Sequence, residues 1–282
     1  MIRIVTDSAA DFEPAEYSAL NVACIPLTVM FGDAEYQENV NLTKDQFYGL
    51  IHETGLFPKT AQASPQILAD LIDDAKNHGD DLIYISISSA LSGTYQTAMM
   101  TKTMAEYDRC FVVDSRNATG GQRMIVEYAA KLRDEGKTAE EIVAAVEALR
   151  DRVVLYACMD TLEYLYRGGR ISHTVYAIGS LAQIKPIIMV DHEGKVEVPA
   201  KAMGMRKGMD YLCKRLEHQI PDPDFPVYAM YTENKANGEA LAKKMNIAGT
   251  AVPAERIINV GAAIGSHIGP NACGLVYIAK EA

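Results

Sequence analysis

Residues 84–98 of the chain read YISISSALSGTYQTA, and the fold depends on the transition that they contain. The stretch begins in a short run of β-forming apolar residues, which predicts a buried strand. A turn rich in serine and glycine follows, and from Ala98 apolar residues return at roughly helical spacing. Unpaired amides of Gly93 and Thr94, the helix dipole and the Ser92 hydroxyl would together form an anion-binding cradle. A purely structural role for Ser92, as the helix N-cap, explains this local pattern equally well.

The composition is that of a globular protein. The 282 residues, 49% hydrophobic and 23% charged, suffice for one large or two modest domains. A net charge of −10 argues against non-specific nucleic-acid binding, so an anionic ligand would need local positive potential. Apolar runs are short and a strand-like segment follows Met1 directly, so we expect no leader, no stable membrane insertion and a cytoplasmic protein. Five scattered cysteines and six histidines show no metal-ligand spacing, so we expect free thiols and no metal.

The first half of the chain alternates strands and helices, which predicts a mostly parallel sheet covered on both faces. Strands are expected near 2–6, 25–31, 82–87 and 110–113. Helices are expected to start near Pro14 and to span about 43–51, 65–75, 94–104, 121–132 and 138–150. Three strand ends are polar, namely Asp7-Ser8, Ser88-Ser89 and Asp114-Ser115. Ligands bind at the carboxyl ends of strands in open α/β sheets, although such residues also favour turns. Residues 60–65 are predicted to form a loop that ends in a helix cap.

The second half has a different pattern, which predicts an α+β unit with antiparallel pairing. Strands are expected near 153–159, 185–190, 196–202, 227–231, 256–260 and 274–278, and helices near 172–182, 205–216 and 236–245. Residues 191–195 read as a hairpin turn with Gly194 at the tight position. Residues 265–271 are expected to form a loop. We place the domain boundary between residues 152 and 153, which gives domains 1–152 and 153–282.

Two further side chains could carry chemistry. His267 is expected in the loop flanked by glycine and proline, where backbone can approach a ligand closely. Arg170 follows Gly168-Gly169 and could clamp an anion. An isolated loop histidine and an isolated arginine are ordinary features, so both matter only if the fold places them beside the cradle.

Eight short motifs, taken in order, resemble the DegV family over essentially the whole chain. They are Asp7-Ser8-x-x-Asp11; Pro26-Leu27-x-Val29 ahead of Tyr36; Thr60-x-Gln62-x-Ser64; Ile87-Ser88-Ser89-x-Leu91-Ser92-Gly93-Thr94-Tyr95-Gln96; Val113-Asp114-Ser115; Gly168-Gly169-Arg170-Ile171; Ile184-Lys185-Pro186-Ile187; and His267-x-Gly269-Pro270. The resemblance implies a two-domain fold, with an N-terminal α/β/α domain on a mostly parallel sheet and a C-terminal α+β domain on a largely antiparallel one.

The resemblance also implies a function. Such a protein binds one long-chain fatty acid, such as palmitate, stearate or oleate, in a tunnel between its domains. It presents the carboxylate to a separate fatty acid kinase and carries the acyl phosphate, without a cofactor and without catalysing a reaction itself. The carboxylate site implied for this chain comprises Thr60, Ser92 and His267, with the Gly93 amide and Arg170 nearby. Supporting positions are Ala61, Ser89 and Thr94, and the kinase-docking positions are Arg167, Arg206 and Lys207.

This chain departs from the family pattern at two places. The family's usual Thr-Ser-Gln-Pro-Ser is Thr60-Ala61-Gln62-Ala63-Ser64 here, which removes a hydroxyl and a rigid proline. The family's His-Thr-Gly-Pro-Gly ends in Asn271, a residue that tolerates positive φ, so we expect the turn to persist. Both changes leave the site in place and could alter acyl preference.

Two other function classes remain open. A serine hydrolase could use Ser92 and His267 on a lipid ester, although Ala90-Leu91-Ser92-Gly93-Thr94 is not a G-x-S-x-G elbow. A phosphate or phosphosugar binder could use the same cradle, and it would have a small polar pocket in place of a long apolar tunnel. The sequence contains neither a P-loop nor a kinase motif set, which fits a protein that leaves phosphoryl transfer to a partner.

Overall fold

The first sheet contains the strand of the opening stretch. The computed structural model describes residues 1–177 and 183–281. Four parallel strands pair in the order β2-β1-β6-β7, namely β1 (Ile2–Asp7), β2 (Val22–Ile25), β6 (Asp81–Ser86) and β7 (Cys110–Asp114). The predicted parallel sheet is therefore confirmed, and β6 lies at its centre.

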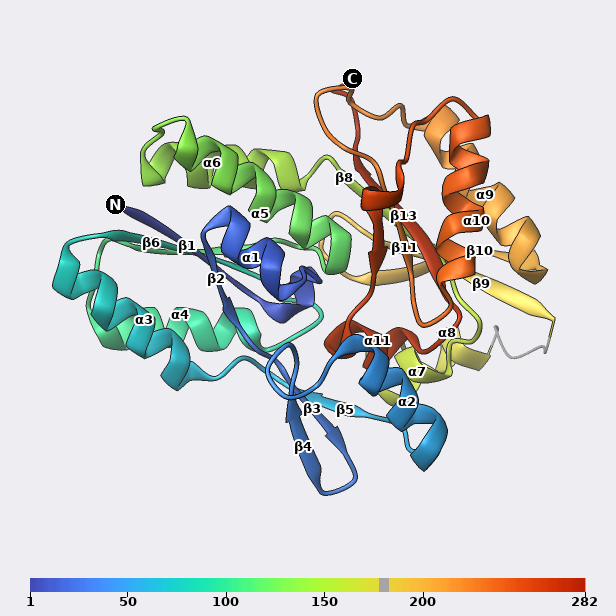
Figure 1. The fold of residues 1–282 in the computed structure, drawn as a ribbon, viewed down its shortest axis with the longest axis horizontal. Helices are drawn as coiled ribbons and strands as arrows, with labels where there is room; N and C mark the ends of the chain where they lie inside the picture. The colour runs from blue at the N-terminus through green and yellow to red at the C-terminus, as the bar shows by residue number, and fades with distance from the viewer. Residues whose placement is uncertain (178–182, 282) are drawn as a thin grey trace.

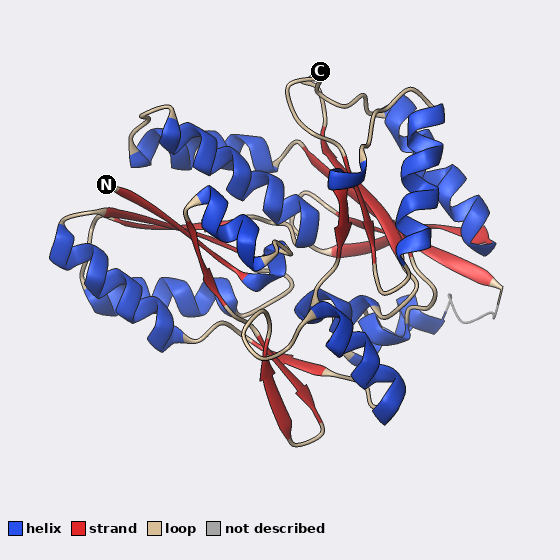
Figure 2. Cartoon of the chain, viewed as in Figure 1, coloured by secondary structure: helices blue, strands red, loops and turns tan. Residues whose placement is uncertain are grey.

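Helices cover both faces of this sheet (Figures 1 and 2). The helices are α1 (Pro14–Leu20), α3 (Pro65–His78), α4 (Thr94–Ala105), α5 (Thr119–Asp134) and α6 (Ala139–Arg150). Along β6, Leu82 and Tyr84 face the core shared with α3 and α4, whereas Ile83 and Ile85 face the core shared with α1, α5 and α6. The alternation follows from the two-residue period of a strand, and it produces the expected α/β/α layers.

The second half forms a six-stranded sheet in the order β10-β9-β8-β13-β11-β12. Its strands are β8 (Val153–Cys158), β9 (Ile184–Val190), β10 (Val196–Met203), β11 (Tyr228–Tyr231), β12 (Ile257–Asn259) and β13 (Cys273–Ile278). Every neighbouring pair is antiparallel except β11 and β12. The largely antiparallel sheet is as predicted, and so is the hairpin turn, where Gly194 has φ +81°.

The two faces of this sheet have different partners. Helices α9 (Gly204–His218) and α10 (Lys235–Ile247) pack on the outer face, around Leu212 and Leu241. On the inner face, Leu155 and Val276 join the core of the first half, which includes Met124 of α5. Among the described residues, no strand before residue 152 pairs with this sheet. We therefore propose that the chain divides into domains 1–152 and 153–282.

A small third sheet corrects one expectation. It has the order β4-β3-β5, from β3 (Thr28–Phe31), β4 (Ala34–Gln37) and β5 (Lys59–Ala61). The sequence predicted a loop from residue 60, but Thr60 and Ala61 belong to β5 and pair with Val29 and Thr28. The segment is too short for a strand pattern to be recognised, and only its pairing with β3 makes it extended. Helix α2 (Lys44–Thr54) connects β4 to β5 and begins with the predicted capping box of Thr43 and Gln46.

Helix α11 corrects a second expectation. The sequence predicted a loop at residues 265–271, but α11 spans Ala262–Ile268 and carries His267 in its last turn. Gly265 suggested a loop, yet it is needed inside the helix, because a Cβ there would lie 2.7 Å from the Phe47 ring and 2.9 Å from the Tyr48 hydroxyl. The predicted turn after the helix is confirmed, since Asn271 has φ +61°.

Short elements complete the fold. They are η1 (Ser8–Ala10), α7 (Glu163–Arg167), α8 (His173–Ala177) and η2 (Ala254–Arg256). The expected continuation of the helix after Ser172 as far as residue 182 lies outside the described residues. Within the described ranges, the five cysteines are free, no helix is long and apolar enough to cross a bilayer, and no group of three potential ligands could hold a metal ion.

Candidate functional site

A cavity lies between the first sheet and the inner face of the six-stranded sheet. Ile87, Leu91 and Ala118 contribute from the loops that follow β6 and β7, at the carboxyl edge of the parallel sheet. Leu155 and Ile188 contribute from the six-stranded sheet. Most of the wall is aliphatic, so the cavity suits an apolar ligand.

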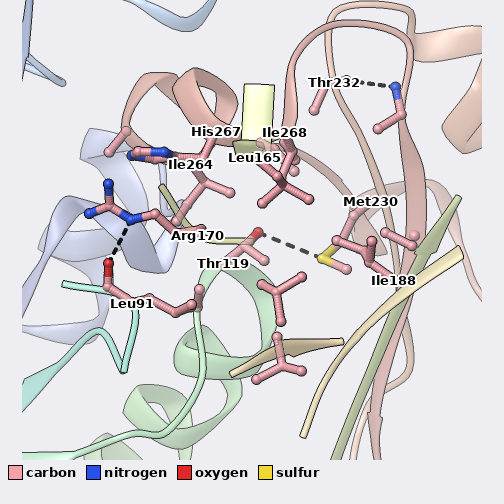
Figure 3. A pocket seen from close by; sticks show the side chains of 18 of the residues that line it. Leu91, Thr119, Leu165, Arg170, Ile188, Met230, Thr232, Ile264, His267 and Ile268 are labelled. Carbon is pink, nitrogen blue, oxygen red and sulfur yellow. Dashed lines mark hydrogen bonds between the residues drawn. The ribbon is translucent and has the colours of Figure 1, made fainter. Parts of the chain in front are cut away.

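Polar side chains gather at one side of this cavity. Thr60 of β5 and His267 of α11 meet there, with 2.9 Å between Thr60 Oγ1 and His267 Nε2. Arg170 and Ser92 line the same cavity. In Figure 3 the His267 ring and the Arg170 guanidinium lie on one side, and Met230 and Ile188 lie on the other. The fold thus brings together four of the predicted residues, from segments that are up to 207 positions apart.

Arg170 brings a positive charge that has no acidic partner. Its Nε donates to the Leu91 carbonyl at 2.9 Å, and its Nη1 donates to the Gly168 carbonyl. In the described part of the chain, no carboxylate lies within ion-pairing distance of its guanidinium. Burial lowers the pKa of Arg170, as expected for a half-buried cation without a counter-ion. An anion in the cavity would supply the missing charge.

His267 is held in its neutral form. Burial, and then the nearby Arg170, lower the pKa of His267 to about 3. Its Nδ1 atom is buried and has no hydrogen-bond partner among the described residues. Gly168 makes this approach possible, because a Cβ at that position would lie 2.2 Å from Nδ1. A neutral imidazole can donate one hydrogen bond and accept another.

The cradle at the start of α4 differs in detail from the predicted one. The N-cap is Gly93, with no side-chain cap bond of its own, and Ser92 precedes it. Ser92 Oγ lies 2.9 Å from Thr94 Oγ1 and accepts the Thr94 amide at 3.3 Å. Ser92 therefore stabilises the helix start and also lines the cavity, so the structural and functional interpretations are compatible.

Thr94 connects the cradle to the segment after β5. Thr94 is buried, and its Oγ1 accepts the Ala63 amide at 3.2 Å. This bond depends on the alanine at position 63, where the family usually has proline, because proline would have no N–H to donate. A hydrogen bond thus fixes the segment that connects Thr60 to α3.

The other predicted residues occupy different positions. Ala61 lines the cavity, whereas Gly93 is exposed at the N-cap and Ser89 donates its amide to Asp114 Oδ1 at 3.1 Å. Neither Gly93 nor Ser89 belongs to the wall. The kinase-docking candidates are all exposed: Arg167 pairs with Glu163 and covers the Phe57 ring at 4.0 Å, and Arg206 and Lys207 lie in the first turn of α9.

Sequence reasoning missed three residues near the site. Thr119 lines the cavity with an unusual φ of +46°, and its Oγ1 lies 3.6 Å from Met230 Sδ. Asp11 and Glu38 lie behind α11 and bind its first amides. Asp11 belonged to a quoted motif, which was a usable signal. Nothing local distinguishes Glu38 or Thr119.

The fold and the site can now be compared with known proteins. A family model described as "Uncharacterised protein, DegV family" matches residues 1–280. A DegV domain-containing protein of Caldanaerobacter subterraneus is 33% identical, with 99% of each chain covered. A solved structure of a DegV family protein from Thermus thermophilus, whose description names fatty acid binding, is 30% identical with a TM-score of 0.88 over 99% of each chain. Bacillus subtilis DegV, described as a fatty acid binding protein, is 26% identical with a TM-score of 0.82 over the same shares. The motif resemblance is thereby confirmed, and the chain belongs to the DegV family.

Proposed function

We propose that this protein binds one long-chain fatty acid in the cavity, with the carboxylate beside Thr60, Ser92, His267 and Arg170. The observation that carries the proposal is an aliphatic cavity whose polar side contains two hydroxyls, a neutral imidazole and a guanidinium without an acidic partner. The Thermus thermophilus and Bacillus subtilis relatives, both described as fatty acid binders, support the ligand class.

The chemistry of each part fits this ligand. Burial of an acyl chain contributes about 0.8 kcal/mol per CH₂ group, so the aliphatic wall supplies most of the affinity. Hydrogen bonds from hydroxyls and from Arg170 to a carboxylate are charge-assisted, and they fix which end of the ligand faces the polar side. A carboxylate would also give the buried imidazole an anionic neighbour and would raise the pKa of His267.

A direct test compares the lipids that the purified protein retains. Organic extracts of wild type and of Ser92→Ala are analysed by mass spectrometry, with Ser89→Ala as the matched control because Ser89 lies outside the cavity wall. We expect a stoichiometric long-chain fatty acid in wild type and in Ser89→Ala, and a depleted one in Ser92→Ala. An absence of lipid in wild type, together with no thermal shift on adding palmitate or oleate, would overturn the proposal.

We further propose that the protein is cytoplasmic, presents the bound carboxylate to a separate fatty acid kinase and carries the acyl phosphate. The absence of a P-loop pattern in the sequence supports this division of labour. Arg167 is exposed on α7, close in sequence to Arg170, and with Arg206 and Lys207 it offers positive charge to a partner. The test is ATP-dependent acyl-phosphate formation with a fatty acid kinase subunit, trapped with hydroxylamine. Failure of Arg167→Glu and of Arg206→Glu/Lys207→Glu to reduce the rate would contradict these docking positions.

The two alternatives have less support. In a serine hydrolase the imidazole would contact the serine and a carboxylate would orient the ring, but His267 Nε2 contacts Thr60 and Nδ1 has no partner in the described chain. A phosphosugar binder would need a largely polar pocket, whereas most of the wall of this cavity is aliphatic.

A further inference from the structure

The N-terminus of α11 rests on two buried carboxylates from the other half of the chain. The Gly261 amide donates to Asp11 Oδ1 at 2.9 Å, and the Ala263 amide donates to Glu38 Oε1 at 3.2 Å. Asp11 follows η1 after β1, and Glu38 follows β4. Each carboxylate has a relative exposure of only 1%. This contact joins the helix that carries His267 to the region that contains Thr60.

The two carboxylates converge on one glycine. A Cβ at Gly261 would lie 2.1 Å from Glu38 Oε1 and 2.8 Å from Asp11 Oδ1, so these two oxygens lie within about 5 Å of each other. The second oxygens, Asp11 Oδ2 and Glu38 Oε2, are buried without a hydrogen-bond partner among the described residues. Two ionised carboxylates so close together in a buried setting repel each other, and protonation of one of them removes the repulsion.

Two neighbouring cations, Lys44 and Arg123, offset the charge of the pair only in part. The Lys44 ammonium donates to the Asp11 backbone carbonyl at 3.1 Å and to Glu13 Oε1 at 2.6 Å, and so is committed elsewhere. Arg123, which also faces Asp11, pairs with Glu16 and Glu127.

Other titratable and polar groups face the pair from the elements around it. Tyr48 is close and donates its hydroxyl to the Val260 carbonyl at 3.0 Å, with Glu233 beyond it. Tyr17 and Cys24 lie near Glu38, and the hydroxyls of Thr119 and Ser8 face Asp11 and Glu38 respectively. Burial, and for Glu38 also the charge of Asp11, raise the pKa of both carboxyls.

We propose that Asp11 and Glu38 are positioning residues of the fatty-acid site, which hold the first amides of α11 while one of them carries a proton, and so set where His267 stands against Thr60. The inference rests on the function proposed above. Its geometric basis is the shortness of α11, since His267 lies six residues after Gly261, and the packing of Gly265 against Phe47 and Tyr48. A shift of the helix start therefore moves the imidazole.

The sign of the pH effect follows from the raised pKa values. A carboxyl whose pKa is higher in the folded state stabilises the fold at low pH, and this stabilisation is lost as the pH rises through the folded value. Removal of this proton leaves two repelling anions at the N-terminus of α11. We therefore expect fatty-acid affinity to fall as the pH rises from slightly acidic to alkaline. A difference of one unit in the pKa of the pair between bound and free protein corresponds to a roughly tenfold fall.

The experiment distinguishes the effect of the carboxyl proton from the effect of the hydrogen bond that each carboxyl accepts from α11. Displacement of a fluorescent fatty acid by oleate is measured across this pH range for wild type, Glu38→Gln, Asp11→Asn and Glu38→Leu. The amides keep an acceptor and cannot titrate, so we expect them to rescue the affinity that Glu38→Leu loses, about tenfold, and to flatten the pH profile. Asp80→Asn is the control, because Asp80 is a buried, ion-paired carboxylate at the opposite edge of the first sheet.

A second measurement needs no ligand. Histidine ring resonances are followed by NMR in delipidated protein, with the His267 signals identified by their loss in His267→Gln. We expect them to shift with the pair's titration in wild type and in Asp80→Asn, and to stay fixed in Glu38→Gln. Identical pH profiles and identical His267 signals in wild type, Glu38→Gln and Asp11→Asn would overturn the positioning role. If wild type binds no fatty acid, the proposed function fails, whereas the ring shifts still decide whether the pair moves His267.

Discussion

Asp7, at the carboxyl end of β1, and His267, in the last turn of α11, differ in how far their hydrogen-bonding groups are satisfied. Asp7 accepts the Ala9 and Ile87 amides, at 3.2 and 2.9 Å, and bonds from Tyr84 and Gln122 as well. Among the residues that the structure describes, His267 has one hydrogen-bonding contact, and its buried Nδ1 has no partner. A buried group whose hydrogen bonds are all made within the chain is part of the fold, whereas an unpartnered nitrogen on a residue that lines the cavity is available to a ligand. We therefore interpret Asp7 as structural and propose His267 as a ligand contact.

The largest expected effect comes from removing the saturated group. Asp7→Ala leaves buried amides and the Gln122 side chain without their acceptor, which should lower the free energy of unfolding by about 3 kcal/mol. Urea denaturation monitored by circular dichroism measures it. The remaining folded protein should still bind fatty acid. Loss of less than about 1 kcal/mol would mean that saturation does not indicate a structural role here.

The next effect should appear in binding and not in stability. Arg170→Gln removes a cation that has no acidic partner, so we expect oleate affinity to fall by about 2 kcal/mol while the free energy of unfolding stays nearly unchanged. Fluorescent-ligand displacement and denaturation give the two values. Arg109→Gln, which removes an exposed arginine paired with Asp81, is the control. Equal losses of affinity in both variants would contradict a specific role for Arg170.

The third prediction concerns the stability of the protein at low pH, which depends on the His267 imidazole. Because the pKa of His267 is lowered to about 3 in the folded protein, delipidated wild type should lose stability as the pH falls below the unfolded value of 6.5. The His267 side chain is partly exposed, so solvent screening reduces the effect. Between neutral pH and pH ~5 we expect the free energy of unfolding to fall by about 1 kcal/mol less in His267→Gln than in wild type. Bound fatty acid should reduce the difference, because its carboxylate raises the pKa of His267. An unchanged difference after loading would place the carboxylate elsewhere.

The smallest effect concerns a position where this chain departs from its family. Ala61→Ser adds to the cavity wall the hydroxyl that the family usually has, and one further hydrogen bond to the carboxylate should tighten binding by less than about 1 kcal/mol. Competition between palmitate and oleate would show whether the added hydroxyl also changes chain preference. Weaker binding of both acids would mean that the hydroxyl only makes the wall more polar.

Local patterns predicted the parts of the fold that depend on local physics. The strand–turn–helix at residues 84–98, the capping box at Thr43 and the tight turn at Gly194 were all predicted, because each depends on residues within a few positions of one another. The same reasoning failed at Gly265, which appeared to break a helix. Its reason for being glycine is the contact with Phe47 and Tyr48, about 220 positions away in the chain.

The site was predicted only as a set of residues. Motif matching selected Thr60, Ser92, Arg170 and His267, but no periodicity could show that β5 would bring Thr60 to α11. Glu38 carried no signal at all, because a carboxylate after a short strand resembles any surface acid. Its role becomes visible only through burial and through the Ala263 amide.

The bond between the Ala63 amide and Thr94 Oγ1 changes how the segment beside the site resists heat. A proline stiffens such a segment by restricting the unfolded chain, which is an entropic contribution of about 0.4–1 kcal/mol. Here a hydrogen bond does so within the folded state, and that interaction is enthalpic. The segment that carries Thr60 should therefore loosen on warming before the core unfolds, and lipid exchange should accelerate more steeply with temperature than in relatives that have proline at this position.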